Sequence, residues 1–208
     1  MSASSSQLEE FKEALASEAG VYQASINIEA IHRLVEYYDL LSRWNARLHL
    51  VAPCRPREFA LRHVLESLML LPHLPESAKV ADIGSGAGLP IIPCLVARPD
   101  ITATLIESSK RKAVFLREAL NRAKTPGTVI AERFEKISAP KVEVITCRAL
   151  DRFEAKLPGL LRWSPPASIK LFFGGEGLRD QIARLNLDFT ETQIPNSKRR
   201  FLFVISGE

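Results

Sequence analysis

The chain has 208 residues, of which 46% are hydrophobic and 25% charged, and its formal net charge is +4. This composition is typical of one globular domain with a small appendage, and it excludes a disordered tail or a fibrous repeat. No apolar run approaches the roughly 18 residues of a membrane span, and the N-terminus lacks the basic and apolar regions of a signal peptide, so we expect a soluble, cytoplasmic protein.

Charge is unevenly distributed along the chain. Residues 1–40 hold seven acids and two bases, a net of −5, whereas residues 41–208 hold 26 bases and 17 acids, a net of +9. A basic body suits a polyanionic partner. A normally solvated surface explains the same excess equally well.

Two helices are predicted in the N-terminal third of the chain. Apolar residues at three- and four-residue steps predict an amphipathic helix over residues 28–48, with Asn27 as its N-cap. A second helix is predicted over residues 58–71, and Pro72 and Pro75 should end it. We expect residues 1–75 to form a helical extension packed on the rest of the protein, in one compact unit.

From residue 76 onward, short β-rich runs alternate with helical windows, which predicts a mostly parallel sheet covered on both faces. The last two runs are joined by Pro-Asn-Ser without a helix, so they should form an antiparallel hairpin at or near one edge. The runs are residues 79–83, 102–107, 127–131, 142–147, 168–173, 189–194 and 201–205, and the helical windows are residues 90–97, 110–123, 153–162 and 176–185.

Seven strands that end in a hairpin are the arrangement of the class I methyltransferases, which use S-adenosylmethionine. We therefore predict an α/β, Rossmann-like domain over residues 76–208, with a seven-stranded, mostly parallel sheet and a C-terminal antiparallel hairpin. A nicotinamide-binding Rossmann fold lacks that hairpin, which disfavours an oxidoreductase.

The first predicted strand leads into a glycine-rich turn that contains Gly84, Gly86 and Gly88. Ligands of open α/β sheets bind beyond the carboxyl ends of the strands, where the strand order reverses, so this turn is a predicted cofactor site. Leu89 stands where a dinucleotide fingerprint requires glycine or alanine. Asp82 could brace the turn by accepting amide hydrogens. A tight turn without a ligand is the alternative.

The next two strands add to this site. Glu107 ends the second strand, where a carboxylate can accept hydrogen bonds from the ribose hydroxyls of an adenosyl group; a solvated acid is the alternative. Phe134 follows the third strand and either stacks on the adenine or belongs to the core.

From about Leu40 to the C-terminus the sequence resembles the RsmG (GidB) family, the 16S ribosomal RNA guanine-N7 methyltransferases. The chain departs from the family at Glu66 and Glu107, where the family has aspartate, and at Ile91, where it has glycine. It also departs at His49, Phe201 and Leu171. The matching segments are Leu41–Asn45, Arg62-His63 with Glu66-Ser67, Asp82–Pro93, Glu107–Leu116, Arg133–Glu135, Cys147–Ala149 and Lys170.

The resemblance implies transfer of a methyl group from S-adenosylmethionine to N7 of a guanine in 16S rRNA, with S-adenosylhomocysteine as the second product. Gly84 and Leu89 would contact the methionine part of the cofactor, and Phe134 and Glu135 would flank its adenine. The predicted cofactor-binding residues are Asp82, Gly84, Gly86, Gly88, Leu89, Glu107, Ser108, Phe134, Glu135 and Arg148.

Guanine N7 carries a lone pair and no proton, so its methylation needs no general base. Catalysis would depend on aligning N7 with the methyl group. An arginine suits the task of holding the O6 edge of the base. Arg148 is the first candidate for this catalytic role and Arg133 the second. An ion pair of Arg148 with Glu135 or Asp151 is the alternative.

The predicted partner is 16S rRNA in the small ribosomal subunit or its assembly intermediate, bound through phosphates and a splayed-out base. Residues after the carboxyl ends of strands should lie on the cofactor's side, and Lys170 is placed at such an end. For residues 198–200, a solvated hairpin turn is the alternative. The predicted RNA-binding residues are Arg62, His63, Lys110, Arg111, Lys112, Lys170 and Arg200.

Other functions stay open. One is a methyltransferase of the same fold that acts on a small molecule or a protein, and another is a ribosome-assembly binder with a vestigial cofactor pocket. We expect a monomer without a membrane attachment. We expect no metal site, because the three cysteines form no C-x-x-C and the four histidines no H-E-x-x-H.

Overall fold

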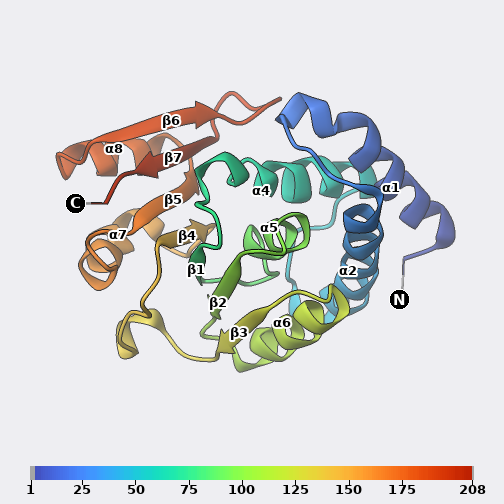
Figure 1. Ribbon diagram of the computed structural model, residues 1–208, viewed down its shortest axis with the longest axis horizontal. Helices are drawn as coiled ribbons and strands as arrows, with labels where there is room; N and C mark the ends of the chain where they lie inside the picture. Colours follow the sequence, from blue (N-terminus) through green and yellow to red (C-terminus); the bar gives the residue numbers. More distant parts are fainter. Residues whose placement is uncertain (1–2, 208) are drawn as a thin grey trace.

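A seven-stranded sheet forms the centre of the computed structural model, which describes residues 3–207 (Figure 1). The strand order is β3-β2-β1-β4-β5-β7-β6. Strands β1 to β5 run parallel, while β7 runs antiparallel to both β5 and β6. The sheet, its terminal hairpin and the class I methyltransferase arrangement are thus as predicted. The strands are β1 (Lys79–Ile83), β2 (Thr102–Ile106), β3 (Gly127–Ile130), β4 (Val144–Arg148), β5 (Ile169–Gly174), β6 (Phe189–Gln193) and β7 (Phe201–Ile205).

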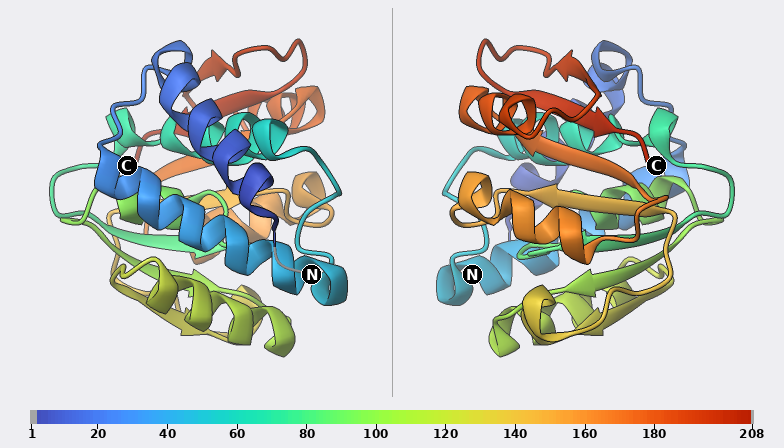
Figure 2. Two further views of the ribbon diagram at one scale, coloured as in Figure 1. Left: turned by 90° about the vertical axis from the view of Figure 1, so that its right-hand side faces the viewer. Right: turned by 90° about the vertical axis from the view of Figure 1, so that its left-hand side faces the viewer.

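Helices follow four of the parallel strands and cover both faces of the sheet (Figures 1 and 2). The exception is β3, which leads into a single 3-10 turn, η4 (Phe134–Lys136). The inner strands β1 and β4 are buried on both faces over most of their length, as a sheet between two helical layers requires. The four helices are α5 (Ile91–Ala97), α6 (Lys110–Arg122), α7 (Phe153–Trp163) and α8 (Glu176–Arg184).

The N-terminal helices cover one face of the sheet. Helix α2 begins where predicted, because the Oδ1 atom of Asn27 accepts a hydrogen bond of 2.8 Å from the amide of Ala30. Ile28 is 61% exposed, so the apolar face starts one turn later than the periodicity indicated. The elements are α1 (Ser5–Glu18), η1 (Ala19–Tyr22), α2 (Ile28–Leu48), α3 (Pro56–Phe59), η2 (Ala60–Leu65), α4 (Glu66–Leu68) and η3 (Leu71–His73).

The second predicted helix differs from expectation at both ends. It begins at Pro56, widens into the π-helical turn η2, and ends at Leu68. Pro72 lies in the following 3-10 turn, η3, and is not the residue that stops the helix. A proline at the start of a helical turn loses no hydrogen bond, which is why it is accommodated there.

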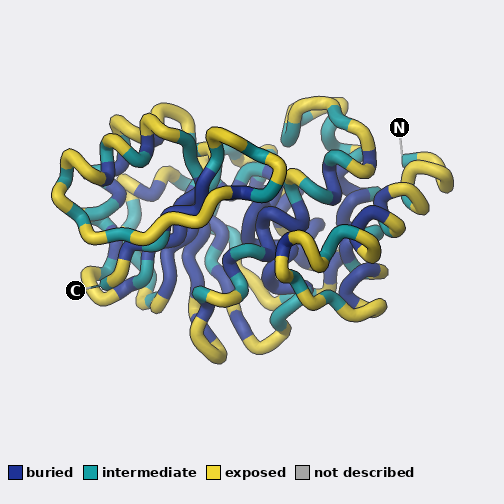
Figure 3. The backbone as a smooth tube through the Cα atoms, turned by 90° about the horizontal axis from the view of Figure 1, so that it is seen from above, coloured by how far each residue is buried: buried dark blue, intermediate teal, exposed yellow. Residues whose placement is uncertain are grey.

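The core has two parts, one on each face of the sheet. Figure 3 shows the buried stretches of the chain in the interior of the molecule. The first joins the N-terminal helices to the sheet, with Phe11 stacked on Tyr38 at 4.5 Å between ring centroids. The predicted boundary at residue 75 falls in the loop between η3 and β1, but residues on both sides share this core. Within residues 3–207, no helix combines the length and apolarity of a membrane span.

Candidate functional site

A cavity of about 570 Å³ opens at the carboxyl ends of β1, β2 and β4, where the strand order reverses on either side of β1. Its volume and its position are those of a small-molecule or cofactor site. We call it the switch-point cavity, and its lining comprises residues 50–52, His63, 83–87, Leu89, 106–108, Lys112, 132–135, 148–151 and Lys156.

The glycine turn forms the floor of the switch-point cavity. Gly84 and Gly86 adopt φ angles of 70° and 52°, which residues with side chains rarely adopt. The amide of Gly84 donates to the carbonyl oxygen of Ile106 at 2.8 Å, and a Cβ on Gly84 would lie 2.9 Å from the Cδ1 atom of Leu150. The turn therefore presents bare backbone to the cavity and ties β1 to β2.

Gly88 has a different role from its two neighbours. It lies outside the cavity lining, and a side chain there would collide with Ile92 on α5. Gly88 therefore allows α5 to pack against the turn, and its contact with a cofactor stays a prediction.

Glu107, and not Asp82, braces the glycine turn. The Oε2 atom of Glu107 accepts a hydrogen bond of 2.9 Å from the amide of Gly86, and its Oε1 atom accepts one of 2.7 Å from the amide of Ser109. Ser109 also caps α6, since its hydroxyl accepts from the amide of Lys112. The Glu107 side chain faces the cavity, and its remaining lone pairs can accept further hydrogen bonds.

Asp82 lies beneath the turn, fully buried and outside the cavity lining, so neither the bracing role nor the direct cofactor contact predicted for it is found. The hydroxyl of Thr146 donates to its Oδ1 atom at 2.7 Å, and no described residue donates to its Oδ2 atom. Burial raises the pKa of Asp82 to about 7.

Tyr37 is a residue of the site that the sequence did not reveal. Its hydroxyl, fully buried on α2, donates a hydrogen bond of 2.7 Å to the carbonyl oxygen of Ala87 in the glycine turn. Burial raises the pKa of this phenol above its usual range, so it remains a donor. Helical periodicity predicted the buried face of α2, but it carries no information about a partner 50 residues away.

The N-terminal extension supplies one wall of the cavity, through the loop residues 50–52 and His63. Burial, followed by the positive charges of Arg148, Arg62 and Arg200, lowers the pKa of His63 to about 3. His63 is therefore neutral at physiological pH. It can donate or accept a hydrogen bond, but it adds no positive charge for binding RNA.

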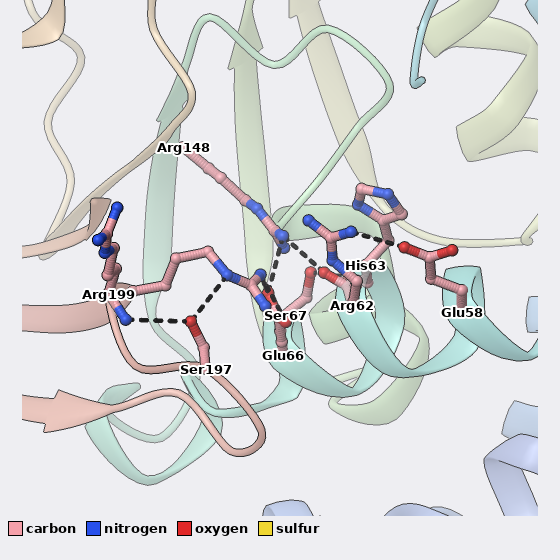
Figure 4. Close-up of polar contacts among 9 residues, drawn as sticks. Glu58, Arg62, His63, Glu66, Ser67, Arg148, Ser197 and Arg199 are labelled. Atoms are coloured by element: carbon pink, nitrogen blue, oxygen red, sulfur yellow. Dashed lines mark hydrogen bonds and ion pairs between the residues drawn. The ribbon is translucent and has the colours of Figure 1, made fainter. Parts of the chain in front are cut away.

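Arg148 ends β4 and reaches the cavity from the side opposite Glu107. Its Nη2 atom donates to the carbonyl oxygen of Arg62 at 2.6 Å and to the Oε2 atom of Glu66 at 2.9 Å (Figure 4). Its ion-pair partner is thus Glu66, and the alternative partners Glu135 and Asp151 are wrong. The buried Nη1 atom has no hydrogen-bond partner among residues 3–207. A buried donor without a partner is uncommon in folded proteins.

The residues after β3 form the side of the cavity nearest η4. Phe134 is buried edge-on against Trp163, with 5.6 Å between ring centroids, as the core alternative anticipated, although it also borders the cavity. Arg133 and Glu135 are exposed at the rim, as is Ser108 after β2.

Two of the predicted RNA contacts are not arranged as expected. Lys170 is the second residue of β5, far from the carboxyl end of that strand at Gly174, so its predicted position on the cofactor's side is wrong. Its side chain is buried, and its Nζ atom donates to the carbonyl oxygen of Pro166. Arg200 does not lie in a solvated turn, because it donates twice to Glu66 at 2.7 Å.

The remaining predicted RNA contacts are at the surface. Lys110 and Arg111 are exposed at the first turn of α6, beside the cavity-lining Lys112. Arg62 is exposed on η2 and pairs with Glu58 at 2.6 Å. The cavity also includes Lys156 from α7, which the sequence analysis did not single out.

Comparison with known proteins identifies what this arrangement is similar to. A family model described as rRNA small subunit methyltransferase G (GidB) matches residues 30–200. The ribosomal RNA small subunit methyltransferase G of Paramagnetospirillum magneticum is 35% identical over 182 residues, covering 84% of this chain and 86% of the relative. The protein of the same name from Xanthomonas campestris pv. campestris is 40% identical over 171 residues, covering 80% and 79%. The solved methyltransferase from Pyrococcus furiosus has a TM-score of 0.58 at 10% identity, covering 85% of this chain and 99% of that one, which shows the shared fold.

Proposed function

This chain belongs to the rRNA small subunit methyltransferase G (GidB) family, and from that premise we propose that it methylates N7 of a guanine in 16S rRNA. It is an S-adenosylmethionine-dependent rRNA methyltransferase. The observation that carries the proposal is that the glycine turn, Glu107 and Arg148 face one cavity at the switch point of the sheet.

The cavity fits the cofactor in its donors, its acceptors and its space. The bare backbone of Gly84 and Gly86 leaves room for close approach, Glu107 offers acceptors for the ribose hydroxyls, and Arg148 adds a guanidinium group to the lining. When bound, S-adenosylmethionine supplies an electrophilic methyl group. We propose that Leu89, Ser108, Phe134 and Glu135 complete the contacts to it.

Arg148 is the proposed catalytic residue, with Arg133 second. A guanidinium fork can donate to O6 of the guanine and leave N7 free to face the methyl group, so the protein acts by alignment and needs no proton acceptor. The buried acid Asp82 lies outside the cavity lining, which agrees with a reaction that uses no general base.

Unpaired cations surround the mouth of the cavity. Lys110, Arg111 and Lys112 occupy the first turn of α6, where like charge opposes the helix dipole, and Arg133 lies on the rim; none of them forms an ion pair with a described residue. Phosphates of an RNA strand would offset that cost. With small-subunit rRNA as its substrate, the enzyme is proposed to act in the cytoplasm as a monomer.

The test is to map N7-methylguanine in 16S rRNA from parent and deletion strains, by borohydride and aniline cleavage followed by primer extension. We expect a stop in the parent, none in the deletion strain, and its return on expression of this chain. Arg148→Ala should fail to restore it, whereas the control Arg179→Ala, at a residue outside the cavity lining, should restore it. An N7 stop that survives deletion rejects the proposal.

A further inference from the structure

Glu66 is a buried carboxylate shared by two arginines (Figure 4). Its side chain is 2% exposed, and it accepts hydrogen bonds of 2.7 Å at both oxygens from the Nη1 atom of Arg200 and one of 2.9 Å from the Nη2 atom of Arg148. Hydrogen bonds between ionised partners are roughly twice as strong as neutral ones. Glu66 therefore fixes both guanidinium groups.

The consequence for Arg148 is a single orientation. Glu66 and the carbonyl oxygen of Arg62 take both hydrogens of its Nη2 atom, and the guanidinium carbon lies 5.3 Å from the centre of the Phe173 ring. The Nη1 atom is buried and has no partner among the described residues, and the Arg148 side chain lines the switch-point cavity. Without Glu66, the carbonyl of Arg62 and the Phe173 ring would be the remaining contacts, and neither fixes the rotation of the fork.

Arg200 brings a distant segment into this arrangement. It follows the turn between β6 and β7, where its Nε atom donates to the hydroxyl of Ser197 at 3.2 Å. Arg200 and Glu66 also line a second cleft of about 450 Å³, which we call the hairpin cleft and which includes Tyr22, Arg55, Arg57 and Asn196. Glu66 thus contacts Arg148, which lines the switch-point cavity, and Arg200, which lines the hairpin cleft.

We infer that Glu66 is a positioning residue for Arg148, and that Arg200 holds Glu66 in place so that the β6–β7 turn is linked to the active site. This inference rests on the proposed function, because it assigns Arg148 to the reaction. A purely structural ion pair would stabilise the fold without affecting turnover. A direct RNA contact by Arg200 would instead affect binding of the ribosomal subunit.

The first variant is Glu66→Gln, which keeps the size of the side chain and removes its charge. The rate constant of methyl transfer to small ribosomal subunits, measured under single-turnover conditions, should fall about a hundredfold. This is the cost of a reacting group that is misplaced by about 1 Å. The KM for subunits and the affinity for S-adenosylmethionine, measured by calorimetry, should stay within about threefold. Glu58→Gln is the matched control, since Glu58 pairs with exposed Arg62 on the same helical segment and makes no contact with Arg148.

Glu66→Asp should recover most of the lost rate, because the charge is kept and the two long guanidinium side chains can follow a carboxylate one methylene shorter. Recovery by Asp but not by Gln supports positioning by charge. Equal turnover of Glu66→Gln and Glu58→Gln overturns the inference.

Arg200→Gln tests the link to the turn and serves alone should Glu66→Gln fail to fold, because the Arg200 side chain is 33% exposed and easier to replace. We expect turnover to fall about tenfold at an unchanged KM for subunits. A higher KM at unchanged turnover would identify Arg200 as an RNA contact and overturn the link. If the unaltered enzyme does not methylate subunits, the proposed function has failed, not this inference.

Discussion

The surroundings of Asp82 predict how the stability of the folded protein depends on pH. It has no exposed surface, and burial raises its pKa from 3.8 to about 7, opposed by the hydroxyls of Ser85 and Thr146 and assisted by the charge of Glu107. In the unfolded chain this carboxyl releases its proton near pH 4, but in the folded protein it retains the proton up to about pH 7.

Between these pH values the folded state binds more protons than the unfolded state, so the free energy of unfolding must fall as pH rises. Each pKa unit corresponds to about 1.4 kcal/mol, and the rise from 3.8 to about 7 therefore corresponds to about 4 kcal/mol lost between pH 4 and pH 8. Asp82→Asn keeps the shape of the side chain and removes the titration. The variant should thus gain stability relative to the unaltered protein as pH rises.

The assay is urea unfolding of the cofactor-free protein and of Asp82→Asn at intervals from pH 4 to pH 8. Titrating groups that do not interact with Asp82 cancel in the difference between the two curves. Asp100→Asn is the control of opposite sign, because Arg98 holds the pKa of the Asp100 carboxyl below its usual range. Its difference curve should show stability lost at neutral pH. Parallel curves for Asp82→Asn and the unaltered protein would refute the argument.

Three further variants test the cavity. Glu107→Ala should weaken S-adenosylmethionine binding at least tenfold by calorimetry, since each hydrogen bond to a charged acceptor contributes about 1.5–3 kcal/mol; unchanged affinity would exclude the ribose contact. Tyr37→Phe leaves the Ala87 carbonyl buried without its donor, so the free energy of unfolding should fall by about 1–3 kcal/mol and cofactor affinity with it; a neutral result would show that water replaces the phenol. Arg148→Ala should leave cofactor affinity within a few fold and abolish most turnover; the reverse pattern would make Arg148 a cofactor contact alone.

The elements were predictable from the sequence because their signals are local. Alternating β-rich and helical windows located all seven strands to within two residues at either end, and the Asn27 cap located the start of α2. Lys170 was misplaced although its strand was predicted over residues 168–173, because its position at the strand end was carried over from the family resemblance and not from the bounds of the strand.

The contacts that build the site were not predictable, because they join residues far apart in the chain. Arg148 and Glu66 are 82 residues apart, so the sequence could suggest that Arg148 has an acidic partner but not which one. The bracing role was assigned to Asp82 because it adjoins the glycines, whereas Glu107 reaches the same turn from the neighbouring strand. Parallel pairing brings strand ends together, and the pairing order is a property of the fold.

The structure also changes the meaning of the uneven charge. Much of the acidity of the N-terminal segment is neutralised by ion pairs, both within its helices and across to the basic body, as in Glu18 with Arg57 and Glu36 with Arg122. These pairs lie away from the switch-point cavity, whereas the cations of the first turn of α6 and Arg133 have no ion-pair partner among residues 3–207. Part of the positive charge that ion pairs leave over therefore lies beside the cavity. Because local unpaired charges and not the net charge set the field at a cleft, a net charge of only +4 is compatible with the proposed attraction of an RNA strand to this face.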